Sequence, residues 1–376
     1  MKIGLLGPSY PFKGGIAHYT TLLYRHLKTR HEVKFYSFKR QYPEWLYPGK
    51  GDKDVSASAL REAGAEQILD SMNLATWVQA WKGLKRFQPD LVILPWWVYF
   101  WTPHFLYLGQ RIKRHLNSKL LFICHNVVAH ESSRLAQLCT SLVLKRGDLF
   151  LVHSQEDEAN LQRILPHAPT ARAFHPSYDV FHQDGISKAA ARQKLGLTGN
   201  TLLFFGFVRP YKGLRYALEA MPAILQKVQT HLLVVGEFWE GKEEYLGLIK
   251  QLGIESHVTV LDHYVANEEI PFYFAAADLL VMPYTSATGS GLVQLAFGLN
   301  MPVIVSNVGA LPEVVRDGET GFVVPAKDAN AVAEKVVQYY RENLEARFRE
   351  NVKKDLPRFS WEGLIEKIEA LYRTSS

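Results

Sequence analysis

The chain has 376 residues, of which 47% are hydrophobic and 21% are charged, with a formal net charge of +6. This length is sufficient for two domains with separate cores, and the composition excludes a disordered chain or a small disulfide-rich scaffold. The two cysteines form no disulfide framework, and the opening "MKIGLLGPSY" lacks the pattern of a signal peptide. We therefore expect a cytoplasmic protein.

The charge is divided unevenly along the chain. Residues 1–178 hold 23 Lys and Arg against 13 Asp and Glu, a net charge of +10, whereas the remainder holds 20 against 24, a net charge of −4. A basic first half favours an anionic partner such as a lipid surface or a phosphorylated substrate, although scattered solubilising charge is an alternative. Nucleic acid is not expected as a partner, because no recognised nucleic-acid-binding module is present.

In chain order, apolar runs alternate with helical patterns. The first half has expected strands at 2–7, 32–38, 91–95, 119–126 and 149–154, with helices from 16 and over 73–87, 103–116 and 131–146. The second half has expected strands at 201–208, 231–236, 258–262, 278–284 and 302–306, again separated by helical patterns. Such alternation predicts two α/β halves with doubly wound parallel sheets and right-handed crossovers, joined near residue 178.

One apolar stretch, 91–108, has only Thr102 and His104 as polar side chains over eighteen residues. That length could indicate a membrane span, but two prolines interrupt it. We expect a buried strand followed by a helix that starts at Thr102-Pro103.

Two loops of the second half have features of an anion-binding site. In "GFVRPYKGL", Arg209 and Lys212 follow a strand and precede a helix, an arrangement that suits a phosphate or diphosphate, although a solvated basic turn is the alternative. In "TGSGLVQLA", residues 288–296, two glycines precede a helix whose N-terminal N–H groups can bind an anion. This second stretch carries no charged side chain.

The first half also offers candidate site residues. His125 and Asn126 end a strand, with His130 close behind, and could transfer a proton or bind a sugar hydroxyl; a core histidine is the alternative. Trp96 and Trp97 in "PWWVYFW" could form a platform for a sugar ring or lipid chain, or could belong to the core. The run 105–119 could lie on an anionic membrane, or be a plain surface helix.

Other site types are disfavoured. The Gly14-Gly15 loop lacks the spacing of a dinucleotide-binding loop, and no acidic residue follows the second strand. The cysteines lack metal-ligand spacing, and no Asp-x-Asp is present to hold a divalent ion. We expect neither a cofactor nor a metal.

Together these stretches resemble a known family. "RPYKG", "ATGSGLVQLAFGLNMPVIVSNVGALPEVVRDGETGFVV", "FSWEGLIEKIEALY", "GGIAHYT", "CHNVVAHE" and "LVHSQED" are similar, in order and spacing, to group 1 (family 4) glycosyltransferases with the GT-B fold. The resemblance implies two Rossmann-like domains facing across a cleft: 1–178 with the closing segment 359–376, and 179–358. It also implies retention of anomeric configuration and no metal requirement.

The resemblance assigns roles to individual residues. Arg209 and Lys212 match the diphosphate-binding pair, and His125 matches the histidine set near the donor sugar. The remaining donor-side residues are the glycine loop, the nucleobase segment and the phosphate-binding turn with its helix start: Gly14, Gly15, Tyr264, Val265, Gly289, Ser290, Gly291, Leu292 and Val293.

The sequence departs from the family where two glutamates, separated by seven intervening residues, normally contact the sugar and the ribose. Thr288 and Ala296 stand there. Three hypotheses follow: an enzyme that uses a neutral contact from Thr288, Ser290 or Gln294; a non-catalytic partner of another transferase; or a sugar-nucleotide epimerase or phosphorylase. We favour the first, because a lost hydrogen bond can be replaced.

The expected function is transfer of a sugar from a nucleoside-diphosphate donor to a glycan or lipid-linked acceptor, in cell-surface polysaccharide or glycolipid synthesis. Trp96, Trp97, Asn126 and His130 are the expected acceptor-side residues. The basic first half is compatible with a peripheral position on the inner face of the cytoplasmic membrane.

Overall fold

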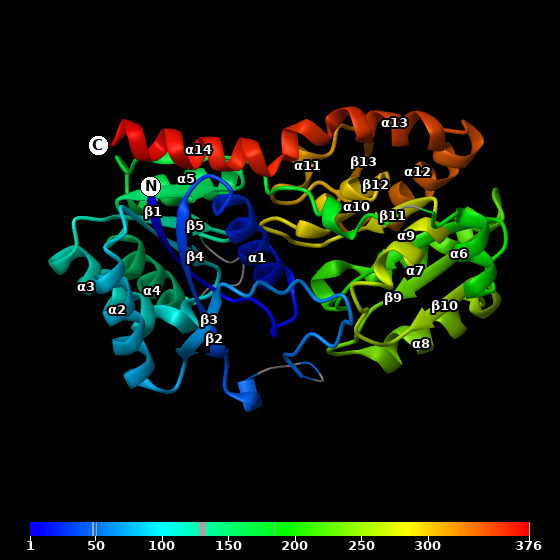
Figure 1. The fold of residues 1–376 in the computed structure, drawn as a ribbon. Coiled ribbons are helices and arrows are strands. Elements are labelled where there is room, and N and C mark those ends of the chain that lie inside the picture. The colour runs from blue at the N-terminus through cyan, green and yellow to red at the C-terminus, as the bar shows by residue number, and fades with distance from the viewer. Residues whose placement is uncertain (47–48, 50, 128–132, 184, 376) are drawn as a thin grey trace. The chain divides into compact units, whose positions relative to one another are not determined.

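The computed structural model describes residues 1–46, 49, 51–127, 133–183 and 185–375 (Figure 1). The chain divides into two compact units. Unit 1 comprises Met1–Val55, Ala59–Phe174 and Trp361–Ser376, and unit 2 comprises Ser56–Ser58 and His175–Ser360. The segment just before 178, which the sequence assigned to the first half, therefore packs with unit 2, where the Ser177 N–H donates to the Phe359 carbonyl at 2.9 Å.

Unit 1 is built on a seven-stranded parallel sheet in the order β3-β2-β1-β4-β5-β6-β7. Its central strands are apolar on both faces because helices cover both sides, as is typical of parallel sheets. The strands are β1 Lys2–Leu6, β2 Glu32–Arg40, β3 Ala65–Asp70, β4 Leu91–Trp96, β5 Lys119–Cys124, β6 Leu149–Val152 and β7 Thr170–Arg172.

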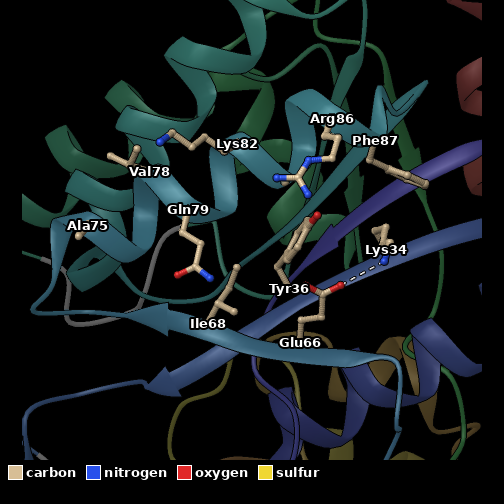
Figure 2. Close-up of a pocket in the computed structure, with 11 residues that line it drawn as sticks. Lys34, Tyr36, Glu66, Ile68, Ala75, Val78, Gln79, Lys82, Arg86 and Phe87 are labelled. Atoms are coloured by element: carbon tan, nitrogen blue, oxygen red, sulfur yellow. Dashed lines mark hydrogen bonds and ion pairs between the residues drawn. The ribbon is translucent and has the colours of Figure 1, made fainter.

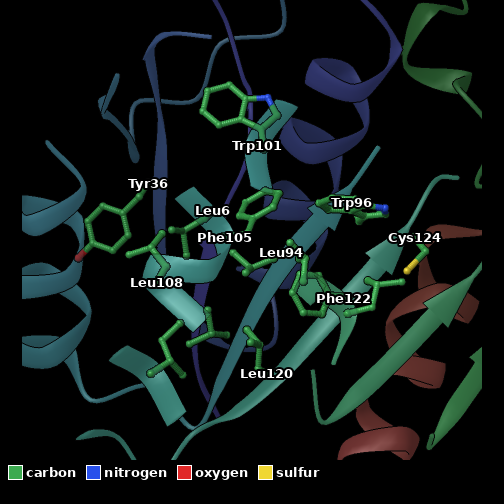
Figure 3. Packing of buried hydrophobic residues seen from close by; sticks show 14 of the residues in the cluster. Leu6, Tyr36, Leu94, Trp96, Trp101, Phe105, Leu108, Leu120, Phe122 and Cys124 are labelled. Atoms are coloured by element: carbon green, nitrogen blue, oxygen red, sulfur yellow. The ribbon is translucent and has the colours of Figure 1, made fainter. Parts of the chain in front are cut away.

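The helices of unit 1 are α1 Gly15–Leu27, α2 Leu74–Phe87, α3 Thr102–His115, α4 Arg134–Leu144, α5 Gln155–Ile164 and α14 Trp361–Thr374. Helix α3 contacts both α2 and α4, so these three form one layer. Their inner side chains share a core with the sheet, in which Phe105 of α3 packs near Phe122 of β5 (Figure 3). The closing helix α14 instead packs against α1.

The apolar stretch 91–108 is divided among β4, a short 3-10 helix at Tyr99–Trp101 and α3. Pro103 lies in the first turn of α3, as expected, but the Thr102 hydroxyl donates to the Tyr99 carbonyl at 2.6 Å instead of capping the helix. In the described part of the chain, no helix combines the length and the apolar character needed to cross a membrane.

Unit 2 has a six-stranded parallel sheet in the order β10-β9-β8-β11-β12-β13. The strands are β8 Asn200–Phe205, β9 Thr230–Val235, β10 Val258–Leu261, β11 Leu279–Met282, β12 Val303–Ser306 and β13 Gly321–Val324. The helices are α6 Lys188–Leu195, α7 Leu214–Leu225, α8 Lys242–Gln251, α9 Ile270–Ala276, α10 Gly291–Gly298, α11 Leu311–Val314, α12 Ala329–Arg341 and α13 Glu345–Asp355. Two Rossmann-like parallel-sheet units confirm the predicted fold class.

Candidate functional site

The strand order reverses between β8 and β11 in unit 2, which opens a binding position at the carboxyl ends of these strands. The loop after β8 carries Arg209 and Lys212, and the loop after β11 leads into α10. The two loops are fastened together, since the Thr285 N–H donates to the Tyr211 carbonyl at 2.7 Å. Gly213 permits this approach, because a Cβ there would lie 1.9 Å from the Pro283 oxygen. Two stretches that the sequence singled out separately thus adjoin.

Arg209 and Lys212 supply the positive charge of this position. The Arg209 guanidinium is exposed and lies 5.0 Å from the Tyr211 ring and 5.2 Å from the Trp239 ring. Lys212 is half-buried, and burial, reinforced by the charge of Arg209, lowers its pKa to about 8. Among the described residues, neither cation forms an ion pair with a carboxylate. Two adjacent uncompensated cations favour binding of a phosphate or diphosphate.

The start of α10 is only partly available to an anion. Ser290 is the N-cap, and its hydroxyl accepts from the Leu292 N–H at 3.3 Å, while the Val293 N–H bonds to the Ser290 carbonyl at 3.4 Å. These contacts use two of the N–H groups that the sequence assigned to phosphate. The N–H groups of Gly289, Ser290 and Gly291 remain as candidate donors.

The positions of the missing glutamates differ sharply in burial. The Ala296 side chain is 0% exposed, so no ligand reaches it, whereas Thr288 is half-buried and its carbonyl accepts from the Ala310 N–H at 3.0 Å. Gln294 is 2% exposed, and Ser290 already caps the helix. Of the three neutral contacts considered from the sequence, Thr288 is the one whose side chain is neither fully buried nor engaged as a helix cap.

A segment that sequence reasoning missed lies against the start of α10. A Cβ at Gly291 would be 3.4 Å from Tyr178 and 3.7 Å from His175, and one at Gly298 would be 2.8 Å from the Asp179 nitrogen. The two glycines therefore let residues 175–179 pack directly on α10. No local motif marks Tyr178 or His175 as site residues, because the helix that contacts them is distant in the sequence.

Aromatic side chains gather at the ends of β8, β9 and β10. Phe207 lies 4.7 Å from Trp239 and is stacked with Tyr264 at 6.2 Å between ring centroids. Val265, expected beside the nucleobase, is buried, with only 7% of its surface exposed. Phe207 and Trp239 were not identified from the sequence, where Phe207 falls within the predicted strand 201–208 and Trp239 follows the predicted strand 231–236.

In unit 1, the strand order reverses between β1 and β4. Gly14, with φ of 109°, and Gly15 begin α1, and a Cβ at either would meet no atom within 4 Å. His125 follows β5, is half-buried, and lies edge-on to the Tyr19 ring at 4.5 Å. Asn126 is also half-buried.

The expected acceptor-side residues of unit 1 have different environments. Trp96 is 1% exposed and packs in the core, so its proposed platform role is wrong (Figure 3). Trp97 is half-buried, and its indole N–H donates to the Tyr42 hydroxyl at 2.9 Å. His130 lies outside the described residues. Within the described ranges, no group of three or more His, Cys, Asp or Glu side chains is arranged to hold a metal ion.

Comparison with known proteins identifies the family to which this chain is similar. Residues 199–342 match the family described as glycosyl transferases group 1. D-inositol 3-phosphate glycosyltransferase of Streptomyces coelicolor is 33% identical over 367 residues, which covers 87% of this chain and 78% of that protein. Phosphatidyl-myo-inositol mannosyltransferase of Mycobacterium leprae is 29% identical over 195 residues, 51% of each chain.

The chain spans less than two thirds of the length of several further relatives. It covers 60% of the D-inositol 3-phosphate glycosyltransferase of Corynebacterium glutamicum and 56% of that of Saccharomonospora viridis. A crystal structure of Anabaena HepE in complex with UDP superimposes with a TM-score of 0.76 over 100% of both chains at 18% identity, a likeness that concerns the GT-B fold. The chain thus belongs to the group 1 family of glycosyltransferases.

Proposed function

We propose that this glycosyltransferase moves a sugar from a nucleoside-diphosphate donor to a glycan or lipid-linked acceptor, with retention of configuration and without a catalytic metal. The observation that carries the proposal is the pair Arg209 and Lys212, uncompensated among the described residues, on a loop bonded to the loop that leads into α10. The UDP in the structural neighbour is compatible with such a donor.

The chemistry requires stabilisation of the leaving group. When the anomeric C–O bond breaks, its electron pair goes to the departing diphosphate, and Arg209, Lys212 and the N–H groups at the α10 start would stabilise this charge. Removing one such donor commonly lowers the rate by about 100- to 1,000-fold. At neutral pH Lys212 is mainly protonated, because its pKa of about 8 is still above the pH, so it can donate to phosphate.

The proton of the acceptor hydroxyl also needs a destination. Neither "GFVRPYKG" nor "PYTSATGSG" contains a carboxylate. We therefore assign the proton to an oxygen of the departing phosphate, which gains charge as the bond breaks. The imidazole of His125 would orient a hydroxyl of the sugar, and Tyr264 would lie beside the nucleobase.

The acceptor part of the proposal rests on chemistry shared with relatives. Their names include transfer to inositol 3-phosphate and to phosphatidylinositol, which are anionic acceptors. The net charge of +10 on residues 1–178 suits an acceptor of that kind. Synthesis of a cell-surface polysaccharide or glycolipid, and a peripheral position at the inner face of the membrane, complete the proposal.

Titration calorimetry with UDP and GDP tests the donor site. We expect Arg209→Ala and Lys212→Ala each to lose binding to the nucleotide that wild type prefers, while an exposed-lysine control, Lys250→Ala on α8, retains it. Wild-type affinity in both site variants would refute the phosphate assignment.

Incubation with a panel of nucleotide sugars and acceptors separates the alternative functions. A transferase releases free nucleotide only when a sugar is transferred or hydrolysed. An epimerase would change the sugar while the nucleotide stays attached. Tight binding to a partner protein, with no turnover of any donor, would instead favour the non-catalytic role.

A further inference from the structure

The backbone on both sides of His125 is fixed by hydrogen bonds within unit 1. The His125 N–H donates to the Trp96 carbonyl at 2.8 Å, which continues the pairing of β4 with β5. Two residues further on, the Val127 N–H donates to the Asp157 carboxylate at 2.8 Å. Asp157 is 2% exposed and also accepts from the Ser154 hydroxyl at 2.9 Å. Because the backbone is held, the orientation of the His125 imidazole depends on the side chains that surround it.

Two aromatic rings contact this imidazole. Tyr19 of α1 lies edge-on to it, with 4.5 Å between the ring centroids and an interplanar angle of 89°. His153, which follows β6, lies 5.4 Å from His125 and 5.5 Å from Tyr19, so the three rings form one cluster. Tyr19 is 0% exposed and lies 5.3 Å from Trp361 of α14, which holds one wall of the cluster in place. His153 is a second wall.

A hydrogen bond to the backbone orients the ring of His153. Its Nδ1 lies 2.9 Å from the Ala173 carbonyl oxygen, and because a carbonyl only accepts, Nδ1 carries the proton. Burial lowers the pKa of His153 to about 4, so at neutral pH the imidazole is uncharged and its Nε2 carries no proton. The Ala173 N–H donates to the Val152 carbonyl at 3.0 Å, which holds the acceptor itself in place. His153 is therefore a neutral ring of fixed orientation beside His125.

We propose that His153 is a positioning residue, which together with Tyr19 holds the His125 imidazole in the orientation that meets a hydroxyl of the donor sugar. The inference deepens the proposed function and rests on it, because His125 orients the sugar only under that proposal. A misplacement of about 1 Å in a group that positions a substrate can lower the rate about 100-fold. His153 thus acts through His125 and need not touch the donor.

A purely structural role for His153 makes a different prediction. Its bond to Ala173 links the ends of β6 and β7, and a structural role would reside in that bond, whereas a positioning role resides in the ring. His153→Asn separates the two roles, because the Asn amide can donate to the Ala173 carbonyl from the place of Nδ1 but has no ring. His153→Phe does the reverse, since it keeps a ring beside His125 and loses the bond.

Two control variants change other parts of unit 1. His104→Phe also replaces a buried imidazole whose pKa is low, but His104 packs against Trp77 and Phe105 in the layer of α2, α3 and α4. Glu66→Gln breaks the ion pair with Lys34, at 3.2 Å, in a groove of about 740 Å³ between α2 and the strands β2 and β3 (Figure 2). That groove lies at the β3 edge of the sheet, whereas β5 and β6 lie toward the β7 edge. Neither control should change turnover.

The kinetic test uses the full chain, with the donor and acceptor that wild type turns over. We expect His153→Asn to lower kcat about 10- to 100-fold with little change in KM for the donor, while His153→Phe keeps most of the activity. In a His125→Ala background, His153→Asn should cause no further loss beyond about twofold, because the ring that it positions is absent. Multiplicative losses in the double variant would overturn the inference, as would higher activity of the Asn variant than of the Phe variant.

A second readout needs no turnover. In nitrogen-15 spectra of the histidine side chains, the resonances of His125 are those missing from His125→Ala. They should form one set in wild type, in His153→Phe and in both controls, and should be split or broadened in His153→Asn, where the imidazole is free to turn. One unchanged set in His153→Asn would overturn the inference. The expected spectra in a wild type without turnover would refute the proposed function while supporting the part that His153 plays at His125.

Discussion

Replacing Lys212 by Met should stabilise the fold and weaken nucleotide binding at the same time. Burial holds the pKa of Lys212 at about 8, below its ordinary value of 10.5. A lysine whose pKa is lowered by folding costs stability while it is charged: the full cost applies below pH 8 and disappears as the pH rises toward 10.5. This lowering of the pKa corresponds to a cost of at most about 3.4 kcal/mol in the free energy of unfolding. Because Lys212 is only half-buried, we expect Lys212→Met to recover about 1–2 kcal/mol of it.

The effect on binding has the opposite sign. Met fills a similar volume but cannot donate a charged hydrogen bond to a phosphate, a loss of about 1.5–3 kcal/mol. The dissociation constant for UDP should therefore rise roughly 10- to 150-fold. In wild type the affinity should also fall as the pH rises above 8, since Lys212 loses its proton there, and this dependence should be absent from the variant.

Thermal denaturation and calorimetry at pH 7 measure both effects on the same preparations. Lys250→Met on α8 is the matched control, because Lys250 is exposed and should change neither quantity. A lower melting temperature for Lys212→Met would show that the lysine supports the fold. Unchanged UDP affinity would show that the cation does not meet the phosphate. Either result refutes the reasoning.

Three further predictions follow from burial and packing. His104 is 1% exposed, and burial lowers its pKa to about 3. The buried neutral imidazole therefore costs no stability above pH 6.5, but the free energy of unfolding falls as the pH drops from 6.5 toward 3, because the unfolded chain then binds a proton that the folded chain does not. His104→Phe should remove this acid destabilisation, which amounts to about 2 kcal/mol at pH 5 in chemical denaturation. Gly213→Ala should lose UDP binding and at least about 1 kcal/mol of stability, since φ is +69° and Pro283 blocks a Cβ, while Gly247→Ala, with open space, should be neutral or stabilising. Ala296→Glu should destabilise the fold by several kcal/mol, because it buries an unpaired carboxylate, and equal urea midpoints for this variant and wild type would contradict the burial seen here.

The strongly apolar strands could be predicted from the sequence, but the two edge strands of the unit 1 sheet could not. Strand β3, "AEQILD", is half-exposed, and β7 has only three residues, so neither gives a clear period. Helix α4 shows a different limit. Its sequence "RLAQLCTSLVL" has apolar residues on two sides, and periodicity alone cannot tell which side the core selects. Trp96 was misjudged for the same reason, because a large aromatic after a strand can be core or platform.

Candidate site residues could be identified from the sequence only where a single loop carries the signal. Arg209 and Lys212 stand three apart, and the glycines of 288–296 mark a turn, so each loop carries its own signal. Tyr178 has no such signal, because its place beside α10 depends on packing between distant segments. Trp239 likewise gains meaning only through the stacking of loops from different strands.

The absence of both family glutamates leaves the two loops of the proposed phosphate position joined, for a structural reason. The loops after β8 and β11 are held together by the backbone, through Thr285 to Tyr211 and through the close approach of Gly213 to Pro283. No carboxylate side chain takes part in either contact. With Thr288 and Ala296 in place of acids, the charges of Arg209 and Lys212 also lack the partial neutralisation that nearby carboxylates would give. The electrostatics therefore favour the proposed diphosphate, and the proposed function requires the sugar to be recognised by neutral groups or by contacts outside these loops.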